Sequence, residues 1–313
     1  MTGDPLRVLE RDDVMCSGHL ACPGCGCTPA YSWALKTLGR RTITVAPACC
    51  FAVIDGPFPY SASGVPFLHA AFEAAPSFAA GVRAALDVAG VEDVQVLVWA
   101  GDGGTYDIGL QSLSACAERN EDMIYVCYDN EAYMNTGIQR SSATPKGAWT
   151  TTTPVSAPKR EPKKHIDEIL AAHRIPYLAT ASISHPEDFL RKMEVARTTK
   201  GFRFIHYYCP CPTGWKAESS HMITLARLAV ETGTFPLFEV FDGERTVVNH
   251  VPSWRPMTEY TSIQGRFAHL SKESVAAMES EAKAAFARLE RRARASEPTP
   301  EPVASGAGER ETR

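Results

Sequence analysis

The chain has 313 residues, of which 44% are hydrophobic and 22% are charged, enough for one large soluble domain or two modest ones. A formal net charge of -4 gives no sign of nucleic-acid binding. The sequence has no apolar run of membrane-spanning length. Its first residues also lack the basic and apolar regions of a signal peptide, so we expect a cytoplasmic protein that does not contact a membrane.

The first distinctive motif is a pair of cysteines, Cys22 and Cys25, with Pro and Gly between them. Such a tight loop brings two sulfurs to one point. A helix is predicted next, with Thr28 as its N-cap, Pro29 as its first residue and Gly39 at its end. A helix N-terminus beside the loop favours the thiolate, which is the form that binds metals. Since the chain lacks a secretory signal, we expect its ten cysteines to be metal ligands or buried thiols rather than disulfides.

Strands and helices alternate in the next part of the chain. Residues 42–46 predict a short strand that leads to Cys49 and Cys50. Residues 65–89 are rich in alanine and predict a helical stretch that ends at Gly90, either unbroken or broken at Pro76. A buried strand is predicted for residues 94–100, because a continuous Val-rich run ended by Gly is typical of a parallel sheet. This alternation favours an α/β fold with right-handed connections.

A glycine-rich turn follows that strand. Gly101, Gly103 and Gly104 surround Asp102, so backbone N–H groups can approach an anion closely. Residues 108–118 predict a helix whose N-terminus adds partial positive charge at the same turn.

A second strand, residues 123–128, leads to Asp129 and Asn130. Asp102 and Asn130 are therefore expected at the C-terminal ends of two parallel strands, where open α/β sheets bind ligands. Carboxylate and amide oxygens suit Mg²⁺, which commonly shares a phosphate ligand. The pattern fits a magnesium diphosphate, although two ordinary solvated strand ends explain the same residues equally well.

Three motifs, in this order, resemble the thiamine-diphosphate segment of 2-oxoacid:ferredoxin oxidoreductases, and more narrowly the β subunit of that family, as in pyruvate synthase. The motifs are Gly101-Asp102-Gly103-Gly104, the run from Asp129 to Gly137, and Thr144-Pro145-Lys146-Gly147-Ala148. The resemblance extends from about residue 19 to about residue 238. It implies the α/β thiamine-diphosphate-binding fold, a mostly parallel sheet flanked by helices on both faces.

The resemblance also implies the roles of individual residues. Asp102 and Asn130 would bind Mg²⁺ through their side chains, and Ala132 through its backbone carbonyl. Asn135 matches an asparagine that faces the reacting centre, and it is the candidate catalytic residue. The expected cofactor-binding residues are Asp102, Gly103, Gly104, Asn130, Ala132 and Asn135.

Four thiolates suit either a [4Fe–4S] cluster or a tetrahedral zinc ion, and the residues alone do not separate the two. The resemblance favours the cluster, with the ligands Cys22, Cys25, Cys50 and Cys211. Motif register selects Cys50 over the adjacent Cys49. It likewise selects Cys211 over Cys209, which lies two residues earlier. Cys27 and Cys209 are expected as extra thiols near the site, and Cys16, Cys116 and Cys127 are expected in the core or on the surface.

A long polar loop covers about residues 139–164 and contains Lys159, Arg160, Lys163 and Lys164. One interpretation of this basic cluster is a solvated surface, and the other is a docking surface for an acidic ferredoxin or a partner subunit.

Beyond the loop, the sequence predicts strands at residues 177–181 and 204–208 and helices at 166–173, 186–198, about 220–233 and 274–296. The expected organisation is an N-terminal arm (1–15), a thiamine-diphosphate domain with the cluster (16–296) and a disordered tail (297–313).

The activity implied by the resemblance is oxidative decarboxylation of a 2-oxoacid, with coenzyme A as acyl acceptor and one-electron transfer through the cluster to ferredoxin. Pyruvate is the first candidate substrate. Cys49 stands where pyruvate enzymes commonly have Gly, so branched-chain and aryl 2-oxoacids and oxalate remain alternatives. A non-oxidative thiamine decarboxylase would leave the four cysteines unexplained. From another class, a zinc-stabilised structural or interaction subunit is the main rival.

The family's activating glutamate comes from the α subunit, and nothing in this sequence matches it. We therefore expect a hetero-oligomer with α-type subunits and with γ- or δ-type subunits that carry further clusters.

Overall fold

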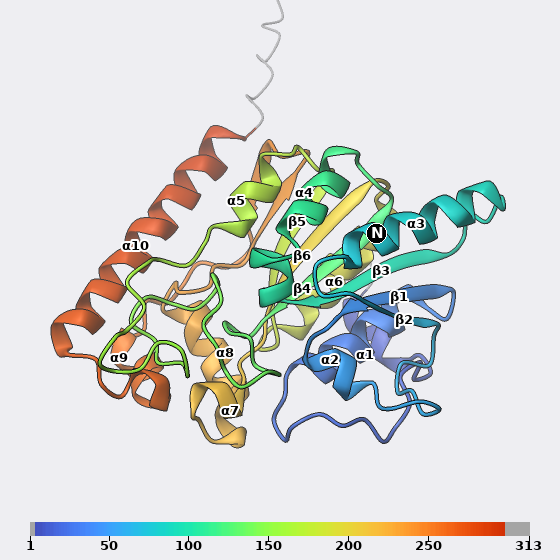
Figure 1. Ribbon diagram of the computed structural model, residues 1–313. Helices are drawn as coiled ribbons and strands as arrows, with labels where there is room; N and C mark the ends of the chain where they lie inside the picture. Colours follow the sequence, from blue (N-terminus) through green and yellow to red (C-terminus); the bar gives the residue numbers. More distant parts are fainter. Residues whose placement is uncertain (1–3, 298–313) are drawn as a thin grey trace, which may run out of the picture.

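A computed structural model describes residues 4–297 (Figure 1). The expected tail at 298–313 lies outside the described residues. The expected N-terminal arm begins with a short 3₁₀ helix, Pro5–Glu10, which has no buried residue. Val14 and Met15, the last two residues of the expected arm, are buried in the core.

The centre of the molecule is one sheet of eight strands in the order β2-β1-β3-β4-β6-β5-β7-β8. Six strands pair in parallel: β1 (Thr42–Pro47), β2 (Phe67–Ala70), β3 (Gln95–Gly101), β4 (Met123–Asp129), β5 (Tyr177–Ser182) and β6 (Phe202–Tyr208). Two antiparallel strands, β7 (Phe238–Phe241) and β8 (Arg245–Val248), complete the edge beside β5. The prediction of a mostly parallel sheet is therefore confirmed.

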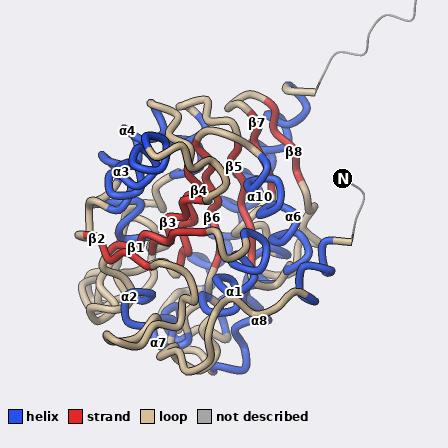
Figure 2. Tube along the Cα trace, turned by 90° about the vertical axis from the view of Figure 1, so that its right-hand side faces the viewer, coloured by secondary structure: helices blue, strands red, loops and turns tan. Residues whose placement is uncertain are grey.

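The described residues form ten α-helices: α1 (Cys27–Leu38), α2 (Cys50–Ile54), α3 (Ala75–Val88), α4 (Leu110–Glu118), α5 (Ile166–Ala171), α6 (Pro186–Thr198), α7 (Pro212–Trp215), α8 (Met222–Glu231), α9 (Met257–Ser262) and α10 (Lys272–Ala295). Two short 3₁₀ helices, Ser219–His221 and Gly265–Phe267, lie beside α8 and α9. Figure 2 shows the strands running through the middle of the molecule with helices around them.

Both faces of the sheet are covered, because side chains along each strand alternate between two cores. On β3, Leu97 and Trp99 pack in one core with apolar residues of α1 and α6. Val96 and Val98 pack in the other core with residues of α3, α4, α5 and α10. A third core lies around α8 and α9. Helices on both faces were predicted, and this arrangement leaves the C-terminal ends of the parallel strands free to form a site.

The helical stretch predicted for residues 65–89 is wrong in part. Its first part forms β2, which pairs with β1 in parallel, and only its second part forms α3. Pro76 occupies the first turn of α3. Proline is tolerated there because no N–H is needed, so this residue starts the helix rather than breaking it.

Helix starts also differ near the two sequence motifs. α1 begins at Cys27 with Gly26 as its N-cap, so the predicted cap at Thr28 lies inside the first turn. A π-helical turn, Gly103–Asp107, precedes α4. Gly109 makes this close turn possible, because a Cβ there would lie 2.0 Å from the carbonyl oxygen of Gly104.

Candidate functional site

The predicted magnesium ligands converge at the ends of β3 and β4. The side-chain amide oxygen of Asn130 lies 2.9 Å from Oδ1 of Asp102 and 3.0 Å from the carbonyl oxygen of Ala132. In this orientation the amide oxygen of Asn130 faces only acceptors. If the amide rotates by 180°, its nitrogen donates to Asp102 Oδ1 and to the carbonyl oxygen of Ala132. A shared cation relieves the same repulsion and uses the three oxygens that the sequence predicted.

Asp102 is nearly inaccessible to solvent, and Ser141 Oγ donates to its Oδ2 at 2.5 Å. Burial raises the pKa of Asp102 well above its usual range, and the negative charge of Asp129 adds to this effect. A buried carboxylate with too little positive charge around it favours a bound cation. The donor set therefore fits Mg²⁺, a hard ion that prefers oxygen ligands.

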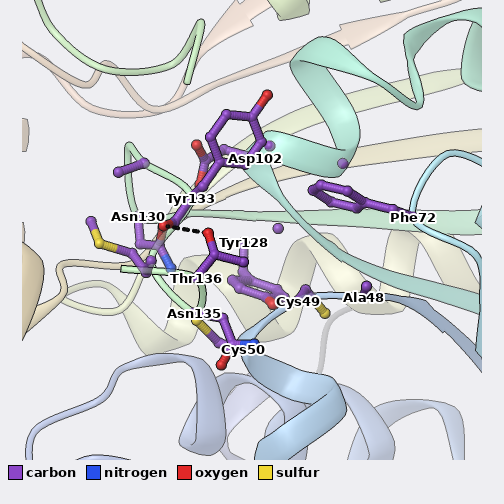
Figure 3. A pocket seen from close by; sticks show the side chains of 15 residues that line it. Ala48, Cys49, Cys50, Phe72, Asp102, Tyr128, Asn130, Tyr133, Asn135 and Thr136 are labelled. Carbon is purple, nitrogen blue, oxygen red and sulfur yellow. Dashed lines mark hydrogen bonds between the residues drawn. The ribbon is translucent and has the colours of Figure 1, made fainter. Parts of the chain in front are cut away.

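A pocket of about 100 Å³ opens beside these oxygens (Figure 3). Ala48, Phe72, Tyr133 and Met134 contribute much of its apolar lining. Gly103 lies against the ring of Tyr133, since a Cβ at this position would be 2.2 Å from a ring carbon. Asn135 also lines the pocket but is exposed at its rim.

The predicted cluster ligands come from three segments, because Cys22 and Cys25 share one loop. Cys22 is exposed, and Cys25, Cys50 and Cys211 are half-buried. Burial raises the pKa of the Cys50 thiol, and neighbouring thiols, Cys211 and Cys25 among them, raise it further. Burial raises the pKa of Cys211 to about 11, with Cys25 and Cys22 as its charged neighbours. These effects show that the thiols are near enough to influence one another.

The two alternative cysteines point elsewhere. Cys49 turns toward Tyr128 and the backbone of Gly101. Cys209 is buried against Cys25 and Cys27. The choice of Cys50 and Cys211 by motif register stays a prediction, and Cys209 lies where an extra thiol was expected.

The spread of the sulfurs bears on which metal group they suit. Among residues 4–297, no three cysteine sulfurs lie within 4.8 Å of one another. A tetrahedral zinc ion with Zn–S bonds of about 2.3 Å holds its sulfurs about 3.8 Å apart. The sulfurs are therefore not arranged as a closed tetrahedral zinc site.

The thiolate form expected beside the helix N-terminus stays a prediction. Contact with Cys209, followed by burial, raises the pKa of Cys25, and the N–H groups of Cys27 and Thr28 oppose this only in part.

Two loops join the oxygen site to the cysteine site. Trp215 Nε1 donates to the backbone carbonyl of Asn130 at 2.8 Å. Gly214 lies against Met134, because a Cβ there would be 2.1 Å from its sulfur. The loop that carries Cys211 thus packs directly on the loop that carries the magnesium ligands.

Comparison with known proteins agrees with this geometry. A family model described as "Thiamine pyrophosphate enzyme, C-terminal TPP binding domain" matches residues 50–207. Ketoisovalerate oxidoreductase subunit VorB of Pyrococcus furiosus is 50% identical over 270 residues, which cover 83% of this chain and 86% of the relative. Pyruvate synthase subunit PorB of Methanothermobacter thermautotrophicus is 48% identical over 271 residues, covering 86% and 94%. This chain belongs to the β subunits of the 2-oxoacid:ferredoxin oxidoreductases.

A solved structure supports the fold of this β subunit. A chain of the 2-oxoglutarate:ferredoxin oxidoreductase from Magnetococcus marinus superposes with a TM-score of 0.56 at 20% identity, over 72% of this chain and 81% of that one. The curated relatives are named as subunits, which implies that the enzyme contains other chains. Within residues 4–297 of the β subunit, no helix has the length and apolar character needed to cross a lipid bilayer.

A buried network of charges behind the oxygen site was not predicted. Lys163 Nζ lies 2.5 Å from Asp129 and 3.0 Å from Glu131. His206 Nε2 lies 2.8 Å from Asp129, and Arg266 lies 2.7 Å from Glu131. Both carboxylates flank Asn130 in the sequence, so the network holds the magnesium loop from two sides.

The pKa values of this network follow from its pairs. Burial opposes the charged form of Asp129, but Lys163 and His206 hold its pKa below the usual range. Burial also opposes a charged His206, but Asp167 and Asp129 outweigh it and raise the pKa of His206 to about 9.

The basic cluster of the loop 139–164 is neither wholly a solvated surface nor wholly a docking surface. Lys159 is buried, and its ammonium group contacts the backbone carbonyls of Ser142, Thr144 and Pro162. Lys163 belongs to the buried network, and only Arg160 is fully exposed. The sequence signal that could have revealed this is the pair of acidic residues around Asn130, which need cations if they are buried.

Proposed function

We propose that this β subunit binds thiamine diphosphate through Mg²⁺ held by Asp102, Asn130 and the Ala132 carbonyl, and carries a [4Fe–4S] cluster on Cys22, Cys25, Cys50 and Cys211. The assembled enzyme then decarboxylates a 2-oxoacid oxidatively, transfers the acyl group to coenzyme A and passes electrons to ferredoxin. When bound, thiamine diphosphate supplies carbanion chemistry and the cluster supplies one-electron transfer.

The main support for the proposal is that three oxygens meet after the ends of β3 and β4. The amide oxygen of Asn130 lies 2.9 Å from Oδ1 of Asp102 and 3.0 Å from the carbonyl oxygen of Ala132. These oxygens occur beside Gly103 and Gly104, which line the same pocket, and beside a second site made of four cysteines. A zinc-stabilised structural subunit would not need the oxygen set.

Residues of this chain hold the proposed magnesium ligands in position. Ser141 holds one oxygen of Asp102, which leaves the other directed at Asn130. Trp215 fixes the backbone carbonyl of Asn130, so that the cluster loop sets the position of the magnesium loop. Phe72 and Tyr133, whose ring centroids are 6.0 Å apart, make an apolar wall that keeps water from the pocket. Asn135, at the rim, remains the candidate for a contact with the substrate.

The small volume of the pocket supports a partner. About 100 Å³ is well below the roughly 300–1,000 Å³ typical of ligand pockets. A partner subunit of the α type would enclose the remainder of the cofactor and bring the activating glutamate. Further γ- or δ-type subunits would carry electrons onward to ferredoxin.

We infer that the substrate is a short aliphatic 2-oxoacid. Relatives named for ketoisovalerate and for pyruvate align at 50% and 48% identity, so identity alone does not choose between them. The apolar lining from Phe72, Tyr133 and Met134 favours an aliphatic side chain over a second carboxylate. Pyruvate and ketoisovalerate are therefore the two candidates to compare first.

The test is a substrate panel on the assembled enzyme, purified without oxygen. Reduction of ferredoxin is measured with pyruvate, ketoisovalerate, 2-oxoglutarate, an aryl 2-oxoacid and oxalate, each with and without coenzyme A. We expect kcat/KM for a short aliphatic acid to exceed that for 2-oxoglutarate, the aryl acid and oxalate at least tenfold, and turnover to require coenzyme A. A preference for 2-oxoglutarate, or no turnover with any acid by an enzyme that contains thiamine diphosphate, contradicts the proposal.

A further inference from the structure

A second group of possible metal ligands lies apart from the oxygen and cysteine sites. His185 precedes α6, Glu231 is the last residue of α8, and His250 follows β8. One ligand atom from each of the three side chains lies within 4.8 Å of the other two. The three residues come from separate segments, so the fold brings them together.

The group is held in place by its surroundings. Glu231 Oε1 lies 3.0 Å from His250 Nε2, and Glu231 Oε2 accepts the backbone N–H of Ser253 at 2.9 Å. Ser184 Oγ lies 2.9 Å from Nδ1 of His185. Metal-binding histidines commonly use their second ring nitrogen in such a contact, which fixes the orientation of the ring. Within the described residues, Nε2 of His185 makes no hydrogen bond and is free for a ligand.

The second imidazole is the feature that an ordinary ion pair does not explain. Glu231 and His250 suffice for an ion pair, yet the ring of His185 lies with its centroid 5.2 Å from that of His250. The side chains of Glu231 and His250 are 18% and 31% exposed. The group is thus sheltered enough to be ordered and open enough for an ion to enter from solvent.

We propose that His185, Glu231 and His250 bind a Zn²⁺ ion, with water as the fourth ligand. Two imidazole nitrogens and one carboxylate oxygen are a recurrent donor set for zinc, with bonds of about 2.0–2.2 Å. The ion would tie the start of α6, the end of α8 and the segment after β8 to one another. This is the edge at which the sheet changes from parallel to antiparallel strands. The site is independent of the proposed thiamine and cluster chemistry.

Cobalt substitution in the assembled wild-type enzyme tests the donor set without any mutation. The enzyme is stripped of loosely bound metal under anaerobic conditions that keep its iron, and Co²⁺ is then added. Ligation by His185, Glu231 and His250 predicts nitrogen and oxygen neighbours and no sulfur around the cobalt in X-ray absorption at the cobalt K edge, which separates cobalt from the iron of the clusters. Sulfur neighbours around the cobalt, or no bound cobalt, overturn the proposal.

Zinc content gives the second measurement. We expect one Zn²⁺ per β subunit that survives gel filtration, and at least 100-fold weaker binding in His185→Gln, Glu231→Gln and His250→Gln. His165→Gln is the matched control, because His165 is exposed and lies outside the group. Unchanged iron and thiamine diphosphate contents show that each variant is folded. Zinc retained at wild-type affinity in all three variants, or absent from the wild type, overturns the proposal.

Discussion

At the scale of single residues, Asp102 and Asn130 show what a strand-end pattern can predict. Each follows a buried strand, and the two strands are neighbours in the sheet, with Gly101 opposite Tyr128. Parallel neighbours bring their C-terminal ends together, so closeness of the two side chains followed from the sequence. Ser141 did not, because it comes from a long loop whose path no periodicity reveals.

Ser141 provides a prediction at this scale. Replacement of Ser141 by Ala removes its hydrogen bond to the buried Asp102 carboxylate. A hydrogen bond to a charged group contributes about 1.5–3 kcal/mol, so Mg²⁺-dependent binding of thiamine diphosphate should weaken roughly 10- to 100-fold. Titration of the cofactor-depleted complex, followed by tryptophan fluorescence, measures the change.

Ser142→Ala is the matched control. Ser142 uses its backbone N–H and carbonyl, and no side-chain hydrogen bond of this residue occurs in the described structure. Its replacement should leave cofactor binding unchanged. Equal binding by the Ser141 and Ser142 variants would show that the oxygen of Asp102 does not need this support.

At the scale of elements, the sequence predicted the long buried strands and the helices with clear ends, and it failed where tertiary contacts decide. The helix Pro186–Thr198 begins and ends where it was predicted. The short strands β2, β7 and β8 were missed, because four residues give too little periodicity and the pairing partner supplies the order.

The candidate site also combines residues that the sequence predicted with residues that only the fold brings together. The four candidate cluster cysteines and the three candidate magnesium ligands came from motifs and the family resemblance, and their metal-binding roles stay predictions. The histidines at 185 and 250 showed no metal spacing, because their proximity arises from three separate segments. The sequence placed Lys159 and Lys163 on the surface. In the folded loop, Lys159 contacts a backbone carbonyl and Lys163 pairs with the buried Asp129.

The buried network makes the stability of the subunit depend on pH. The pKa of His206 is raised from its ordinary 6.5 to about 9, so its charged form stabilises the fold. That contribution is complete below about pH 6.5 and is lost as the pH rises through about 9. At roughly 1.4 kcal/mol for each pH unit between these values, the free energy of unfolding should fall by about 3 kcal/mol.

Thermal unfolding of the complex between pH 6 and pH 10 measures this effect. In Asp167→Asn, which removes the largest contribution that raises the pKa of His206, the loss should begin at lower pH. Asp12→Asn, at an exposed position outside the ion pairs of the described residues, is the control and should follow the wild-type profile. A midpoint that is flat across this range, or identical profiles for the two variants, contradicts the assignment of charge to His206.

At the scale of the whole molecule, the β subunit places two sites at one edge of a parallel sheet. One is a set of oxygens suited to magnesium diphosphate, and the other is a set of four cysteines suited to a cluster. The packing of Gly214 on Met134 and the hydrogen bond from Trp215 to Asn130 make them neighbours. This adjacency supports the proposed transfer of electrons from the thiamine site to the cluster site within one chain.

The most direct test of this account is electron paramagnetic resonance of the anaerobic complex, frozen after addition of its 2-oxoacid. The matched variant is Asp102→Ala, which removes a magnesium ligand and leaves all four cysteines. In the wild type we predict that the 2-oxoacid produces the signal of a reduced [4Fe–4S] cluster. In Asp102→Ala the same signal should appear with dithionite but not with the 2-oxoacid. A 2-oxoacid-dependent signal of equal size in both proteins would contradict the role of the Asp102 site as the source of the electrons.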